Sequence, residues 1–171
     1  MSPGRVVLIG FMGSGKTTVG RILASRLGWA FIDTDTLVEE RAGARIAEIF
    51  RTQGEDAFRE LESMVIAELA PRGKIVVATG GGAPAQQANR AFFEQQSAAV
   101  FHLRVSLASA LRRTGGNPAR PLLSQDQAAI SALYESRRTL YDALGVPVET
   151  EGLSPAAVAE QVMMLLKSPT R

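Results

Sequence analysis

The sequence predicts a three-layer α/β/α fold, in which helices cover both faces of a parallel β-sheet. Short apolar, β-branched runs alternate with longer segments of helical periodicity. Strands separated by helices pair in parallel, and a parallel sheet is normally buried on both faces. A glycine-rich turn at 10–15 joins the first apolar run to the first helical segment. The chain has 171 residues, which suit one domain, and we expect that domain to span 1–171.

Five short runs have the character of buried strands. They are apolar, and several consist largely of valine and isoleucine, which favour strands. In chain order they are RVVLI (5–9), WAFID (29–33), KIVVAT (74–79), AAVFHL (98–103) and VPVE (146–149). Because ligands of parallel sheets bind at the carboxyl ends of the strands, the residues that follow these runs are the candidates for a functional site.

Helical segments fill the spaces between the runs. The apolar residues of 17–27 share one side, and Gly28 is placed to end that helix. The last helix is expected to begin at Pro155, with Ser154 as its N-cap. The expected helices are 17–27, 34–42, 44–50, 55–70, 84–96, 106–113, 125–144 and 155–167.

Composition narrows the function classes. A formal net charge of +2 is too small to indicate a nucleic-acid-binding protein. There is no cysteine, which excludes disulfides and thiolate metal sites. The apolar run before the glycine turn is too short for a signal peptide or a membrane span. We therefore expect a cytoplasmic protein that binds neither nucleic acid nor membrane, and we expect a monomer.

The glycine turn carries a phosphate-binding motif. Gly10, Gly15, Lys16 and Thr17 match the pattern G-x-x-x-x-G-K-[ST] between a strand and a helix. Glycines let the backbone N–H groups approach phosphate oxygens, and the helix start adds partial positive charge. Lysine would reach the outer phosphates and threonine would bind magnesium. The alternative is a glycine-rich turn with a chance lysine; the motif favours a nucleoside triphosphate.

Two carboxylates follow the second strand. Asp33 and Asp35 lie two residues apart, so continued strand geometry would point both side chains the same way. One carboxylate is suited to organise magnesium through water, and the other to take a proton from a substrate hydroxyl. The alternative is that Asp35, or Thr34, merely caps the next helix.

The third strand ends in Gly80, Gly81 and Gly82. Three glycines remove side chains where a second molecule would lie against the backbone, and their N–H groups can bind oxygen. A tight turn is the alternative, although it would rarely need three glycines.

Arginines occur at helical positions and in one loop. Arg59 lies three residues from Glu62, so a plain surface ion pair is one interpretation. Arg137 shares a helix side with Tyr134 and Tyr141, which favours a place in a cleft, where its forked guanidinium binds a carboxylate. Arg138 is expected to face solvent.

The loop LRRTGGNPARPLL (111–123) combines three arginines with glycine and proline. This composition is typical of a lid that closes over phosphates. An exposed loop without a function is the alternative.

With these motifs together, the chain resembles the bacterial shikimate kinase family, of the nucleoside monophosphate kinase-like branch of P-loop proteins. The resemblance covers about 5–165 and is carried by GFMGSGKTTVGRILASRLGWAFIDTD, IAEIFRTQGEDAFRELE, TGGG, RRTGGNPARPLL and SRRTLY. It implies a five-stranded parallel sheet in the order 2-3-1-4-5, a substrate-binding region at about 34–62 and a lid at about 112–124. It also implies MgATP-dependent phosphorylation of the shikimate 3-hydroxyl, toward chorismate and the aromatic amino acids.

Family roles carry over where the motifs match. The resemblance implies ATP contacts at Gly13, Ser14, Gly15, Lys16, Thr17, Thr18, Arg113 and Arg120, with Arg113 stacked on adenine. It implies magnesium binding by Thr17 and, through water, by Asp33. It implies shikimate contacts at Asp35, Arg59, Gly80, Gly81, Gly82 and Arg137. Catalysis is assigned to Asp35 as the candidate base, with Lys16 and Arg120 stabilising the transferred phosphate. A final adenine contact near 152–155 is poorly matched.

Two other function classes share the first motif. A gluconate or nucleotide kinase would not require Asp35, Arg59, the glycine triplet and Arg137 together. A guanine-specific switch should carry N-K-x-D, which the sequence lacks, and its D-x-x-G match at 142–145 does not follow a strand.

Overall fold

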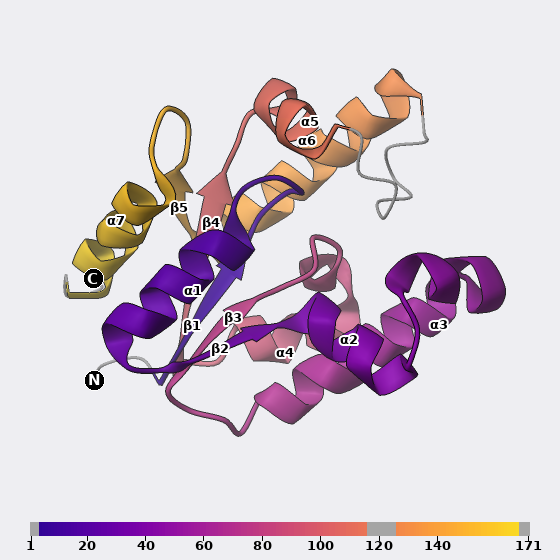
Figure 1. Cartoon of the computed structure of the whole chain (residues 1–171), viewed down its shortest axis with the longest axis horizontal. Coiled ribbons are helices and arrows are strands. Elements are labelled where there is room, and N and C mark those ends of the chain that lie inside the picture. The colour runs from indigo at the N-terminus through magenta and orange to yellow at the C-terminus, as the bar shows by residue number, and fades with distance from the viewer. Residues whose placement is uncertain (1–3, 116–125, 168–171) are drawn as a thin grey trace.

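A five-stranded parallel sheet forms the centre of the computed structural model, which describes residues 4–115 and 126–167 (Figure 1). The strand order is β2-β3-β1-β4-β5, and every neighbouring pair is parallel. The strands are β1 (Arg5–Ile9), β2 (Ala30–Asp33), β3 (Ile75–Ala78), β4 (Ala98–Arg104) and β5 (Val146–Glu149). The predicted fold class and strand order are confirmed.

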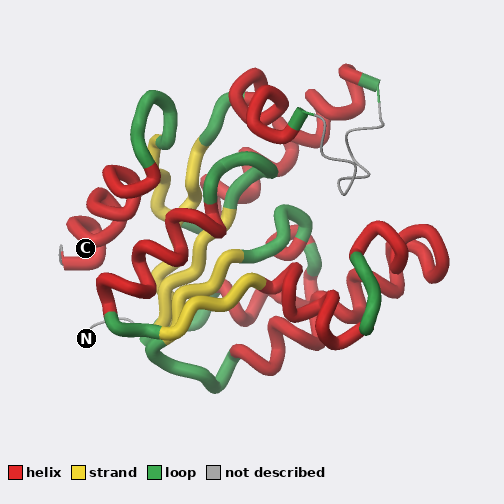
Figure 2. The backbone as a smooth tube through the Cα atoms, viewed as in Figure 1, coloured by secondary structure: helices red, strands yellow, loops and turns green. Residues whose placement is uncertain are grey.

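Helices cover both faces of this sheet, and Figure 2 shows the strands in yellow between them. The helices are α1 (Lys16–Leu27), α2 (Thr34–Ala42), α3 (Ile46–Leu69), α4 (Arg90–Phe93), α5 (Leu107–Thr114), α6 (Gln127–Leu144) and α7 (Pro155–Lys167). Within residues 4–115 and 126–167, none of them combines the length and the hydropathy needed to cross a bilayer.

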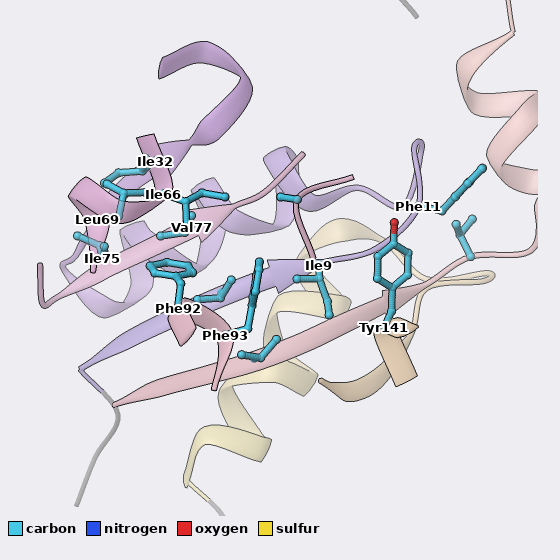
Figure 3. Close-up of a cluster of buried hydrophobic side chains, with 14 of the residues drawn as sticks. Ile9, Phe11, Ile32, Ile66, Leu69, Ile75, Val77, Phe92, Phe93 and Tyr141 are labelled. Atoms are coloured by element: carbon cyan, nitrogen blue, oxygen red, sulfur yellow. The ribbon is translucent and has the colours of Figure 1, made fainter. Parts of the chain in front are cut away.

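Side chains of β1 divide the core into two layers. Val6 and Leu8 pack toward α1 and α7, whereas Val7 and Ile9 pack toward α3, α4 and α6. This alternation is the period of two that a strand imposes on its side chains. Figure 3 shows the second layer, in which Tyr141 of α6 lies beside Ile9. All four β1 side chains are fully buried, as expected for the central strand of a covered sheet.

Two helix predictions differ from the structure. The segment expected as one helix at 84–96 instead forms two 3-10 turns, Ala83–Ala85 and Gln87–Asn89, followed by the short α4. Gln86 is extended, with φ of −81° and ψ of 122°, so a continuous helix does not form there. The helices expected at 44–50 and 55–70 are joined as α3, which is interrupted at Gly54 by φ of 87° and ψ of 175°.

Candidate active site

The predicted site residues meet at a cavity of about 560 Å³, beside the carboxyl ends of β1, β2 and β3. Its walls come from the glycine turn after β1, from α2 and α3, from the turn after β3, and from α6. The predicted residues that line it are Gly13, Gly15, Lys16, Thr17, Thr18, Asp33, Asp35, Arg59, Gly80, Gly81, Gly82 and Arg137. Segments far apart in the sequence therefore form one site at the predicted edge of the sheet.

The phosphate-binding turn depends on glycine conformation. Gly10, Gly13 and Gly15 have φ values of 149°, 74° and 93°, which side-chain-bearing residues rarely adopt. Gly15 precedes α1, and Lys16, Thr17 and Thr18 of the first helical turn line the cavity. Lys16 Nζ lies over the same turn and donates to the carbonyl oxygens of Gly10 at 2.8 Å and of Phe11 at 3.1 Å. The turn has the geometry and charge that bind a phosphate chain.

Other predicted nucleotide contacts lie around the turn. Ser14 is buried, and its hydroxyl accepts from Lys16 Nζ at 3.4 Å. Arg113, on α5, donates from Nη1 to the carbonyl oxygen of Gly13 at 3.1 Å, so its guanidinium lies against the turn from outside the cavity wall. Arg120 falls outside the described residues.

Thr17 and Asp33 form the candidate magnesium-binding pair. The Thr17 hydroxyl donates to Asp33 Oδ2 at 2.8 Å at the edge of the cavity. In the part of the chain that the structure describes, no group of three acidic or histidine side chains gathers to hold a metal. Magnesium commonly needs only one or two protein oxygens besides phosphate oxygens and water, so this hydroxyl and carboxylate fit it.

The first turn of α2 positions Asp33 and Asp35 differently from the prediction. The strand ends at Asp33, whose Oδ1 accepts the Asp35 backbone N–H at 3.1 Å and so caps α2. The cap is therefore Asp33, rather than Asp35 or Thr34. Strand geometry does not continue, because Thr34 is the first helical residue. Asp35 nevertheless lines the cavity because the helix starts at its edge.

Arg59 is held by two carboxylates of its own helix. Its Nη1 lies 2.9 Å from Glu62 Oε2, and its Nη2 lies 3.0 Å from Glu55 Oε1. The side chain of Glu62 is 1% exposed and that of Arg59 is 16% exposed, so the pair is not the surface ion pair considered above. Burial lowers the pKa of Arg59, but Glu62 and Glu55 outweigh burial and leave it above its usual value. The guanidinium therefore stays charged inside the cavity wall.

Glu62 is the most buried charged group of the site. Burial raises its pKa above the usual value and nearby Asp35 adds to this, while Arg59 opposes them. Among the described residues, Glu62 Oε1 has no hydrogen-bond partner. This burial was not predicted. The available signal was the spacing of four residues from the apolar Phe58, which places Glu62 on the core-facing side of α3.

The glycine triplet after β3 leaves room for neighbouring side chains of the same chain. A Cβ atom at Gly80 would lie 2.5 Å from Glu62 Oε1 and 2.7 Å from Asp35 Oδ1. A Cβ atom at Gly82 would overlap the guanidinium of Arg59. Part of the space that the triplet leaves is therefore filled by the side chains predicted to bind the acceptor.

Arg137 and Tyr141 reach the triplet from α6. Arg137 Nη1 donates to the carbonyl oxygen of Gly82 at 3.2 Å, and the Tyr141 hydroxyl donates to that of Gly81 at 2.6 Å. Arg138 instead pairs with Glu135 at 2.9 Å, with its side chain 52% exposed. The structure thus places Arg137 in the cavity and Arg138 outside it.

The apolar part of the cavity wall was also missed. It consists of Phe50 and Phe58, whose ring centroids are 4.9 Å apart, together with Ile46, Leu133 and Met12. The sequence analysis gave these residues no role at the site, because only the tertiary arrangement shows which apolar residues border a cavity.

A phosphate-binding turn on a five-stranded parallel sheet, beside a cavity that Asp35, Arg59 and Arg137 line, defines a P-loop kinase of small acidic molecules. The shikimate kinase family model matches residues 12–167. A shikimate kinase of Moorella thermoacetica is 45% identical over 167 residues, which cover 97% of this chain and 96% of that relative. The chain belongs to the shikimate kinase family.

Solved structures agree with this assignment. The shikimate kinase from Acinetobacter baumannii, solved in complex with shikimate, has a TM-score of 0.91 and 37% identity. The match covers 96% of this chain and 93% of that one. A gluconokinase from Sinorhizobium meliloti, at 19% identity and a TM-score of 0.59, shares the fold alone.

Proposed function

We propose that this chain transfers the γ-phosphoryl group of MgATP to the 3-hydroxyl of shikimate. The observation that carries the proposal is that Asp35, Arg59 and Arg137 line the same cavity as Lys16. An acidic acceptor explains two guanidinium groups in that cavity, because arginine binds a carboxylate through paired hydrogen bonds. A neutral sugar would not require them.

Lys16 and Thr17 hold the donor. In the structure Lys16 Nζ bonds to carbonyl oxygens of its own turn, and phosphate oxygens would replace these partners. Magnesium, when bound beside Thr17 and Asp33, supplies positive charge to the phosphate oxygens. The turn's N–H groups then keep the terminal phosphate pointed at the acceptor half of the cavity.

Asp35 prepares the acceptor. With the substrate carboxylate on Arg59 and Arg137, the substrate hydroxyl lies near Asp35. The hydroxyl oxygen attacks the γ-phosphorus, the bond to the bridging oxygen of the leaving ADP breaks, and the hydroxyl proton passes to Asp35. Lys16 stabilises the negative charge on the transferred group.

The remaining assignments belong to the same proposal. One domain spans 1–171, with a substrate-binding region at about 34–62 and a lid at about 112–124 that carries Arg120 to the phosphates. Arg113 stacks on adenine, which is consistent with its contact to the phosphate-binding turn. We further propose a cytoplasmic monomer.

An ADP-release assay tests the proposal directly. The protein is incubated with ATP and magnesium, and with shikimate, gluconate or a nucleoside monophosphate as acceptor. We expect ADP release with shikimate only, and none when magnesium is omitted. ADP release with gluconate or a nucleotide but not with shikimate would overturn the assigned acceptor.

A further inference from the structure

We propose that Thr34 and Tyr141 are positioning residues: they hold the turn Gly80–Gly82 from opposite sides and so present the backbone N–H of Gly81 to the acceptor. This inference deepens the proposed function and rests on it. Neither residue was assigned a role above, and neither is placed in contact with the substrate.

Thr34 holds the peptide that precedes the donor group. Its hydroxyl oxygen accepts the backbone N–H of Gly80 at 3.0 Å, and Thr34, the first residue of α2, is fully buried. A buried hydroxyl is retained at a cost in desolvation unless it is hydrogen-bonded, and this bond satisfies it. The bond ties the glycine turn to the helix that carries Asp35.

Tyr141 holds the peptide that follows the donor group. Its hydroxyl donates to the carbonyl oxygen of Gly81 at 2.6 Å, and the residue is 1% exposed. The ring packs against His102, with centroids 5.1 Å apart, and belongs to the core layer in Figure 3. Burial raises the pKa of Tyr141 far above its usual value, so the hydroxyl keeps its proton and remains a donor.

The peptide that joins Gly80 to Gly81 lies between these two hydrogen-bonded peptides, and it carries the N–H that we expect to bind the acceptor. Its carbonyl oxygen, from Gly80, accepts the backbone N–H of Ala83 at 3.1 Å. Its N–H, from Gly81, makes no hydrogen bond to any described residue, although Gly81 lines the cavity. Backbone donors inside proteins are nearly always satisfied, so an N–H without a protein partner in a cavity wall points to a ligand oxygen.

Three glycines in a row would leave this N–H poorly oriented without support, because glycine has the widest choice of backbone conformations. Since Thr34 fixes the preceding peptide and Tyr141 the following one, the middle N–H has a defined direction before the acceptor arrives. Such preorganisation raises affinity by reducing the entropy lost on binding.

Single-atom variants test the clamps. Tyr141→Phe and Thr34→Val each remove one hydrogen bond while keeping the shape of the side chain. We expect each to raise KM for shikimate roughly three- to tenfold, as the loss of about one hydrogen bond predicts, with KM for ATP unchanged. Equal changes in both KM values would overturn the proposal, since they would indicate a general structural role.

The chain offers matched controls for both variants. Tyr134, on the same helix, also donates its hydroxyl to a backbone carbonyl, that of Val105 at 2.8 Å, but away from the glycine turn. Tyr134→Phe should therefore leave KM for shikimate unchanged, and Thr34→Ser, which keeps the hydroxyl, should restore it. If Tyr141→Phe behaved like Tyr134→Phe, the proposal would be wrong.

Hydrogen exchange separates this inference from the proposed function. In the protein without acceptor, the peptide that contains 79–83 should exchange several-fold faster in Tyr141→Phe and Thr34→Val than in the wild type and Tyr134→Phe. Unchanged exchange rejects the clamps even if the enzyme phosphorylates shikimate. Faster exchange in a protein that does not phosphorylate shikimate supports the clamps and rejects the assigned acceptor.

Discussion

Two glycine-rich turns lie side by side in the cavity wall, after the neighbouring strands β1 and β3, and they use glycine for different physical reasons. In the turn after β1, Gly10, Gly13 and Gly15 have positive φ values that other residues rarely adopt. In the turn after β3, no glycine has a positive φ among the described residues. There, side chains of Asp35, Glu62 and Arg59 occupy the space that a Cβ atom would need.

The first turn is therefore a property of the local backbone, whereas the second is a property of tertiary packing. A phosphate-binding turn is built mainly from neighbours in sequence, so one motif describes it. The turn after β3 depends on α2, α3 and α6, which are distant in sequence. If this comparison is right, substitutions at the two turns should have separable effects on the two substrates.

The largest effect should come from Asp35→Asn. The amide keeps the shape of the carboxylate but cannot accept the hydroxyl proton, so we expect kcat to fall by roughly 10²-fold or more. ATP affinity should be unchanged, because Asp35 belongs to the second turn's side of the cavity. Turnover is measured by ADP release, and ATP binding by calorimetry in the same preparation.

Asp56→Asn is the control, because Asp56 is exposed on α3 and its removal changes the net charge equally. Full turnover by Asp35→Asn would show that Asp35 is not the catalytic base.

Next in size is Arg137→Ala. Losing one charged partner of a carboxylate should raise KM for shikimate by about 10- to 100-fold, with KM for ATP near the wild-type value. Arg138→Ala is the adjacent control, since Arg138 pairs with Glu135 at the surface. If KM for shikimate rose equally in Arg137→Ala and Arg138→Ala, the cause would be the loss of positive charge in general rather than the loss of a contact in the cavity.

The comparison itself is tested by alanine at one glycine of each turn. Gly82→Ala should displace the guanidinium of Arg59 from Glu62, which raises KM for shikimate by roughly tenfold, although φ of −84° at this position suits alanine. Gly10→Ala meets the carbonyl oxygen of Leu103 at 2.7 Å and keeps a strained φ of 149°, so it should lower stability by about 1–3 kcal/mol.

Urea denaturation and steady-state kinetics on both variants give the answer. The distinction fails if Gly82→Ala leaves KM for shikimate unchanged, or if Gly10→Ala is as stable as the wild type.

The same distinction explains what the sequence predicts. The approximate bounds predicted for helices 34–42 and 155–167 agree with the structure. Ser154 caps the second helix as predicted and accepts the Ala157 N–H at 3.2 Å, whereas the first helix is capped by Asp33, which accepts the Asp35 N–H at 3.1 Å. The predicted helix at 84–96 is wrong because Gln86 is extended and no local signal in the sequence marks that break. Local signals therefore gave element boundaries wherever the capping chemistry was local.

Site residues follow the same rule. Lys16, Thr17 and Asp35 belong to short motifs, and the structure brings them together at the predicted edge of the sheet. Glu62 and Thr34 were missed as partners because their importance comes from burial beside the glycine turn. The helical spacing from Phe58 indicates that Glu62 is buried, but no spacing within one segment predicts that Glu62 and Thr34 lie beside Gly80.

The smallest expected effect concerns the core behind the second turn, where His102 packs on Tyr141. Burial lowers the pKa of His102 below its usual value, although the bond to Asp142 opposes this. As pH falls through about 6.5, the unfolded chain takes up the histidine proton before the folded one does. Folding stability associated with His102 is therefore full above that pH and decreases toward acid.

His102→Gln cannot titrate but can still hydrogen-bond to Asp142. Tm of the wild type should therefore fall more between pH 7.5 and 5.5 than that of the variant, by about 2–4 °C. His102 is the single histidine of the sequence, so no other imidazole obscures the difference. Parallel Tm curves would show that this histidine does not link protonation to the core beneath the second turn.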